Sequence, residues 1–225
     1  VAVPGNHDVP LFRLHERILR PYALYRTYIA RELDFVLRRP DAVLVALNST
    51  SPLRTITNGR IRRRQLRLCR DAFRSAPPRA ARIVVAHHHF APPPDYQGGQ
   101  VMPHARRALD AFTALRVELL LGGHQHRAYI GNSLDLYPGR DRDHGIIIVH
   151  CGTSTSRRGR AREREKNSFN LLRVGEDTVR ITHYMYFDDV GGFAPVSRHV
   201  FPRPGTRFLT GAERNDAAHG AAHGA

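Results

Sequence analysis

Histidine and asparagine residues occur in three short motifs that lie far apart in this chain. The first is Gly-Asn-His-Asp at residues 5–8, the second is a run of three histidines at residues 87–89, and the third is Gly-His-Gln-His at residues 123–126. Borderline ions such as Mn²⁺, Fe²⁺ and Zn²⁺ accept imidazole nitrogen and amide oxygen together. A pair of such ions can clamp the oxygens of a phosphate ester and activate a water molecule. The residue types therefore indicate a divalent metal site suited to phosphate ester hydrolysis.

The three motifs can form one site only if the strands before them end close together. Residues 1–3 are predicted to be the end of a strand, and residues 83–86 and 117–121 are predicted to be buried strands. Loops at the carboxyl ends of parallel strands meet at one edge of a sheet, so we expect the motifs to converge. In Gly-His-Gln-His the imidazoles stand at positions i and i+2, which point the same way if the segment is extended.

The rest of the chain divides into an alternating part and a part made of strands. Before about residue 120, apolar spacing predicts two helices within residues 11–37 that are separated by Pro21, a strand at 42–47 and helices at 60–74 and 103–115. After it, strands follow strands, at residues 145–151, 168–174, 178–187 and 194–201. This order predicts an α/β fold, layered as in α+β proteins, with a β-sandwich flanked by helices and the metal site at the strand C-termini.

Composition sets the domain limits. Residues 1–204 are expected to form one domain, and the low-complexity residues 205–225 are expected to be disordered. A segment rich in proline and glycine, residues 92–100, is expected to form a loop over the site. Residues 139–144 and 156–167 are expected to be charged loops.

The charge of +15 does not by itself predict a nucleic-acid partner. Lys166 is the single lysine among 35 cationic residues, a bias that fits a GC-rich coding sequence, and the arginines are spread along the chain. Basic stretches interleaved with aromatic residues, which would stack bases, are not found in the sequence. We therefore expect a small phosphodiester or nucleotide-like substrate rather than nucleic acid.

The cysteines and the apolar runs say little about the function of the chain. Cys69 and Cys151 lack metal-type spacing and are predicted to be free thiols. The sequence has no apolar run of about 18 residues, so no transmembrane helix is predicted. We expect a cytoplasmic protein, and the sequence leaves its oligomeric state open.

The three motifs resemble the third, fourth and fifth motifs of the calcineurin-like metallophosphoesterases. These are Gly-Asn-His-(Asp/Glu), a histidine that ends a strand, and Gly-His-x-His. Residues 47–50 and 58–61 also resemble the bacterial branch described as class III cyclic-nucleotide phosphodiesterases. The resemblance covers roughly residues 1–150 and implies phosphodiester hydrolysis by two divalent ions, with Mn, Fe or Zn as candidates. A cyclic nucleotide, a glycerophosphodiester or a nucleotide-sugar lipid would each fit as substrate.

The resemblance also implies roles for individual residues. The ligands of the second ion would be Asn6, His87 and His124, with His87 chosen because it comes first after its strand. His88 is the alternative, because the histidine run leaves the register open. His126 would bind the first ion, and His7 would be the general acid. Asp8 would orient its neighbours rather than bind metal.

The chain departs from the family pattern before its first motif. The family's motifs Asp-x-His and Gly-Asp-x-x-(Asp/Asn), which include the metal-bridging aspartate, should precede Gly-Asn-His-Asp, and no such pair follows it. We therefore expect an N-terminally truncated chain that lacks the first strands and has little or no activity by itself. The missing strands would expose unpaired sheet edges and favour aggregation. The alternative is a catalytically inactive protein of this fold with a binding or regulatory role.

Overall fold

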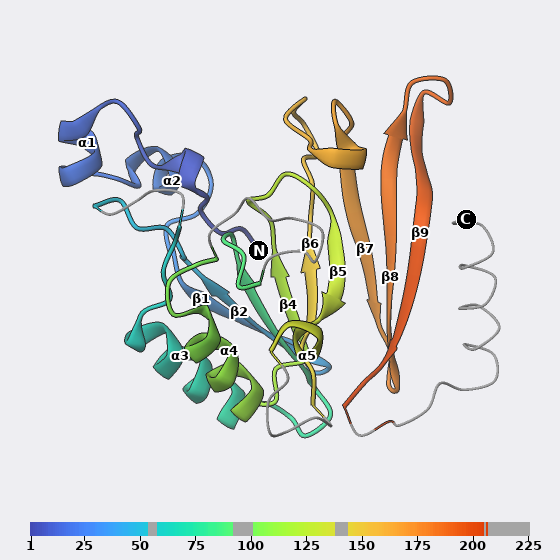
Figure 1. Cartoon of the computed structure of the whole chain (residues 1–225). Helices are drawn as coiled ribbons and strands as arrows, with labels where there is room; N and C mark the ends of the chain where they lie inside the picture. Colours follow the sequence, from blue (N-terminus) through green and yellow to red (C-terminus); the bar gives the residue numbers. More distant parts are fainter. Residues whose placement is uncertain (54–57, 92–100, 138–143, 205, 207–225) are drawn as a thin grey trace.

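Two sheets and a layer of helices make up the computed structural model (Figure 1). It describes residues 1–53, 58–91, 101–137, 144–204 and 206. A six-stranded sheet is formed by β1 (Phe35–Arg38), β2 (Ala42–Leu47), β3 (Ala81–Ala86), β4 (Leu119–Gly122), β5 (Tyr129–Asn132) and β6 (Ile147–His150). A three-stranded sheet is formed by β7 (Ser168–Val174), β8 (Thr178–Phe187) and β9 (Gly192–Pro202). The helices are η1 (Asn6–Asp8), α1 (Leu14–Leu19), α2 (Ala23–Tyr28), α3 (Arg63–Arg74), α4 (Ala105–Ala114), α5 (Ser133–Leu136) and η2 (Ala161–Glu163).

The six-stranded sheet is parallel at its centre. Its order is β1-β2-β3-β4-β6-β5, in which β2, β3, β4 and β6 run parallel and the edge strands β1 and β5 run antiparallel to their neighbours. The helices α3 and α4 cover one face (Figure 1). The parallel strands therefore end at a common edge, where the loops that follow β3 and β4 lie side by side.

Alternating apolar residues give the central sheet two buried faces. On β3, Val84 and Ala86 belong to the core beneath α3 and α4, whereas Ile83 belongs to the core between the sheets. Across that second core, Val179 and Ile181 of β8 are fully buried. Burying one such side chain contributes about 1.5–3 kcal/mol. Packing on both faces holds the ends of β3 and β4 in fixed positions.

The predicted fold class is confirmed, as are most of the predicted elements. Strands at 42–47, 168–174 and 178–187 have the predicted limits, and the helix predicted at 60–74 begins at Arg63. The prediction for residues 1–3 is wrong, because they belong to no strand. The second helix predicted within residues 11–37 ends at Tyr28, because the apolar residues of β1 pair with β2 instead.

Some predictions fall on parts of the chain that the structure does not describe. The loop predicted at residues 92–100 lies outside the described residues, and so does nearly all of the segment after residue 204. The described helices include none that is long and apolar enough to cross a membrane. Both cysteines are free. The cytoplasmic location stays a prediction.

Candidate metal centre

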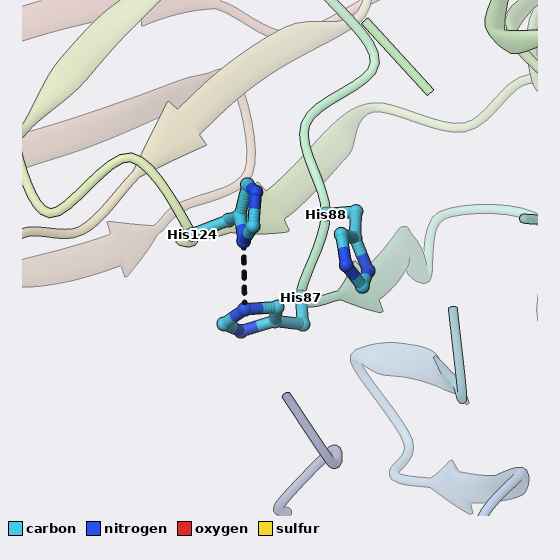
Figure 2. A group of neighbouring side chains, drawn as sticks. All are labelled: His87, His88 and His124. Atoms are coloured by element: carbon cyan, nitrogen blue, oxygen red, sulfur yellow. Dashed lines mark hydrogen bonds between the residues drawn. The ribbon is translucent and has the colours of Figure 1, made fainter. Parts of the chain in front are cut away.

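The ends of β3 and β4 bring the second and third motifs together. His87 follows directly on β3, and His124 stands two residues after β4. The backbone N–H of Gly123 donates to the His87 carbonyl at 3.1 Å, which fixes one loop against the other. Figure 2 shows the His87 and His124 rings meeting edge to face, joined by the dashed line, with His88 beside them. The predicted convergence of these two motifs is therefore present in the structure.

Asn6 completes a triangle of possible ligand atoms. Its Oδ1 lies 2.9 Å from His87 Nε2 and 3.2 Å from His124 Nδ1, and these two nitrogens are 3.2 Å apart. Ligand atoms about 2.0–2.1 Å from a tetrahedral ion stand roughly 3.4 Å from one another. A divalent cation therefore fits these three donors with small adjustments. Such an ion would add positive charge where only neutral donors meet.

Burial and neighbouring histidines keep the imidazoles of His87 and His124 uncharged. Burial, followed by the neighbouring His88 and His124, lowers the pKa of His87 well below its ordinary value. Burial, followed by His88 and His89, lowers the pKa of His124 to about 3. A neutral imidazole offers a lone pair to a metal ion, whereas a protonated one cannot bind it. Both side chains are therefore available as ligands at neutral pH.

His88 is buried beside the triangle and remains an alternative ligand. Possible ligand atoms of His87, His88 and His124 all lie within 4.8 Å of one another. Ser49 Oγ accepts from the backbone N–H of His88 at 3.1 Å and lies 2.8 Å from His88 Nδ1. Gly59, at φ +62°, packs against the same ring, and a Cβ there would collide with it. Ser49 and Gly59 thus meet at His88.

The turn that carries Asn6 is held by Asp8 and Gly5. The Asp8 carboxylate accepts from the Gly5 backbone N–H at 2.7 Å, so it braces the turn and lies outside the group of possible metal ligands. The orienting role of Asp8 stays a prediction. Gly5 also lies directly under the His87 ring.

His7 and His126 lie apart from this group and near each other. Their ring centroids are 6.1 Å apart, and His7 is exposed. The expectation of an extended Gly-His-Gln-His segment is wrong: residues 124–127 form a bend, with φ of +71° at His124 and +57° at His126. His126 Nδ1 lies 3.2 Å from the Arg158 carbonyl, to which only a protonated nitrogen can donate. That bond leaves Nε2 with the lone pair a metal ion requires.

Sequence reasoning missed a set of buried polar side chains behind His124. His89, Gln125 and His150 are buried, and their side-chain nitrogen and oxygen atoms have no hydrogen-bond partner among the described residues. The His89 ring stacks on His124 with centroids 5.6 Å apart. Burial lowers the pKa of His150 to about 3. The first two lie within the motifs, but His150 ends an apolar strand and has no motif to mark it.

Fold and site together define an α/β protein with a candidate metal centre at the carboxyl ends of parallel strands. Residues 1–128 match the calcineurin-like phosphoesterase family, and the chain belongs to that family. The family predicted from the three motifs is therefore confirmed.

Solved structures that match this chain share little sequence with it. A dimetal phosphatase from Danio rerio is 13% identical, with a TM-score of 0.53 over 89% of this chain and 71% of that chain. PhoD is 12% identical, with a TM-score of 0.47 over 85% of this chain and 49% of that one. A Vps29 double mutant from Entamoeba histolytica is 16% identical, with a TM-score of 0.35 over 86% of this chain and 90% of that chain. The Danio rerio structure supports the fold alone. No curated protein matches the chain.

Proposed function

We propose that this chain supplies half of the metal centre of a phosphoesterase that hydrolyses a phosphodiester. The triangle of Asn6 Oδ1, His87 Nε2 and His124 Nδ1 carries the proposal, because it gathers three neutral donors from three distant segments. These residues would hold the second divalent ion, and His126 would contribute to the first. Such ions supply Lewis acidity and make a bound water acidic. Mn, Fe and Zn all suit the donor set.

His7 is the proposed general acid. It is exposed, adjoins Asn6 in the turn and lies near His126, so it can reach a leaving oxygen on a substrate bound at this edge. Proton donation to a leaving group typically contributes about 10²–10⁴-fold in rate. A general acid does not bind a metal ion, so the proposed role of His7 differs from the ligand roles proposed for Asn6 and His126.

An adjoining cavity supports a substrate with an apolar or aromatic portion. It measures about 560 Å³ and extends from Asn6 and His7 along Val9, Leu11 and Phe12. Phe12 is 92% exposed, so its ring is available to stack on a base or cover a hydrocarbon. A small phosphodiester or nucleotide-like substrate would place its phosphate near Asn6. The contacts of residues 47–50 and 58–61 with His88 are consistent with a class III type of site.

Among the described residues the group of possible ligands contains three imidazoles and no carboxylate. With His126 alone, the first ion would be weakly held, and no group would bridge the two ions. The chain by itself is therefore expected to bind one ion and to have little or no activity.

Two measurements test this proposal. Titration of the 225-residue chain with Zn²⁺ or Mn²⁺ should give one site that His124→Ala weakens strongly and His15→Ala, an exposed control in α1, leaves unchanged. The full-length gene product should hydrolyse bis-p-nitrophenyl phosphate with Mn²⁺ and lose activity with EDTA. Metal binding that survives His124→Ala unchanged would rule out the proposed ligand set.

A second candidate function is a binding or regulatory protein that keeps this fold without catalysis. The absence of a carboxylate from the described ligand group favours it. This alternative predicts metal binding with no turnover in the full-length protein. Hydrolysis that depends on His7 would exclude it.

A further inference from the structure

The part of the chain between η1 and β1 displays many apolar side chains to solvent. It contains α1 and α2, and we call residues 11–32 the α1–α2 segment. Figure 1 shows these two helices at the upper left, on the opposite side of the molecule from the three-stranded sheet. Between Leu11 and Ile29, eight large apolar side chains are more than half exposed. Exposed apolar groups gathered in this way mark an interaction surface.

Each of the two helices carries an exposed apolar pair. In α1, Leu14 and Ile18 stand four residues apart, so they share one face, and they are 63% and 52% exposed. In α2, Leu24 and Tyr28 have the same spacing and are 56% and 77% exposed, whereas Tyr25 is buried. A surface helix normally packs its apolar face on the core. The core of this protein accounts for Tyr25 but not for the exposed pairs.

The α1–α2 segment is held against the body of the protein. The Tyr22 hydroxyl lies 2.5 Å from Thr50 Oγ1, and Arg17 Nε donates to the Pro52 carbonyl. These bonds tie both helices to the loop that follows β2. Leu53 in the same loop is 74% exposed. The apolar side chains are therefore presented by a fixed surface rather than by a loose chain end.

The charge of the segment is positive. Residues 11–32 contain five arginines and two glutamates, which gives a net charge of +3. Arg20, Arg26 and Arg31 are exposed, and within the part of the chain that the structure describes their guanidinium groups form no ion pair. Protein interfaces gather apolar side chains at the centre and charges at the rim. Here arginines alternate with apolar residues along the whole segment, as in segments that lie on anionic bilayers.

We infer that the α1–α2 segment binds the surface of an anionic lipid bilayer, with its apolar side chains below the headgroups and its arginines on lipid phosphates. Guanidinium groups match phosphate oxygens, and an amphipathic ring such as that of Tyr28 suits the headgroup level. A second copy of the chain is a poorer partner, because a two-fold contact would bring the same arginines together. Leu11 and Phe12 also line the cavity beside the metal centre, so binding would bring that cavity to the bilayer.

The test is flotation of the full-length gene product with lipid vesicles in a density gradient. The vesicles contain phosphatidylcholine alone or an equal mixture of phosphatidylcholine and phosphatidylglycerol. The protein should float with the mixture and much less with phosphatidylcholine alone, and rising salt should weaken the binding. The gradient contains EDTA, so neither metal nor turnover contributes. Failure of the proposed hydrolysis would therefore leave this result unchanged.

Two variants test the apolar and the charged parts of the surface. Leu24→Ser together with Tyr28→Ser removes an exposed apolar pair and should weaken binding by about tenfold or more. Arg20→Gln together with Arg26→Gln should weaken binding to the anionic mixture by about fivefold for each charge. All four side chains are exposed, so these changes should leave the fold intact, as circular dichroism would verify.

Matched controls carry the same kinds of change elsewhere. Arg67→Gln together with Arg70→Gln removes two exposed charges from α3, and Val190→Ser removes a 66% exposed apolar side chain between β8 and β9. Neither control should change flotation. Equal losses in the controls, equal flotation with both lipid compositions, or no flotation would overturn the inference. A dimer in sedimentation that Leu24→Ser with Tyr28→Ser dissociates would also overturn it and assign the surface to a second copy.

Discussion

Gly5 lies so close to the His87 ring that a Cβ atom at residue 5 would stand 2.8 Å from His87 Cε1. Real Cβ atoms do not approach other heavy atoms this closely, so any larger residue must displace the imidazole or the turn. The same glycine donates its backbone N–H to Asp8. The first motif therefore needs glycine because its backbone packs against His87, a proposed ligand from the second motif.

Gly5→Ala should weaken metal binding while preserving the fold. The added methyl group pushes His87 Nε2 away from Asn6 Oδ1, and misplacing one ligand should lower the affinity for Zn²⁺ by about 10–100-fold. Titration calorimetry on the wild type and the variant would measure the change, and circular dichroism would verify the fold.

Gly123→Ala is the matched control for this change. It also precedes a histidine of the site, but its added Cβ would meet only the Cys151 carbonyl oxygen, at 3.9 Å. Its metal affinity should stay within a factor of a few of the wild type. If both variants lost affinity equally, the close approach of Gly5 to His87 would not be the cause.

The sequence was sufficient to predict that His87 and His124 meet. It was not sufficient to predict the position of Asn6 or the backbone conformation at His124 and His126. His87 and His124 could be paired because each follows an apolar strand, and parallel strands end at one edge. Asn6 could not be placed this way, because residues 1–5 form no strand. The left-handed backbone at His124 and His126 carries no local signal, since it is uncommon in residues other than glycine. It depends on tertiary contacts such as the bond from His126 to the Arg158 carbonyl.

His7→Ala should separate catalysis from metal binding. In the full-length protein, turnover of bis-p-nitrophenyl phosphate should fall by about 10²–10⁴-fold, because the leaving oxygen loses its proton donor. Metal content measured by atomic absorption should remain near that of the wild type, since the proposal gives His7 no bond to a metal ion. A variant that loses metal in step with activity would assign His7 to the ligand set instead.

The stability of the metal-free chain should fall as the pH is lowered from about 7 toward 4. Burial lowers the pKa of His150 from 6.5 to about 3. Between these values the unfolded chain binds a proton at this residue that the folded chain does not, so the free energy of unfolding rises with pH. The contribution is complete above pH 6.5 and is lost progressively as the pH falls toward 3. Urea unfolding across this range would measure the slope.

His150→Leu should reduce that slope. Leucine cannot take up a proton, so the variant should lose less stability than the wild type between about pH 7 and pH 4. Some slope should remain, because burial also lowers the pKa of His89 and His124. Identical slopes in the two proteins would mean that His150 is not the group whose protonation opposes folding.

Glu163 should be among the side chains on which stability depends most. It is buried, accepts from the Ala128 backbone N–H and the Ser168 hydroxyl, and so ties η2 to the bend of the third motif and to β7. Glu163→Ala would leave both donors without this acceptor and should lower the free energy of unfolding by about 2–4 kcal/mol. Glu163→Gln keeps one acceptor oxygen and should cost less. Glu165→Ala, at an exposed position two residues away, should change stability by no more than about 0.5 kcal/mol. Urea denaturation of the three variants measures these differences, and a Glu163→Ala protein as stable as Glu165→Ala would show that these bonds do not hold the bend in place.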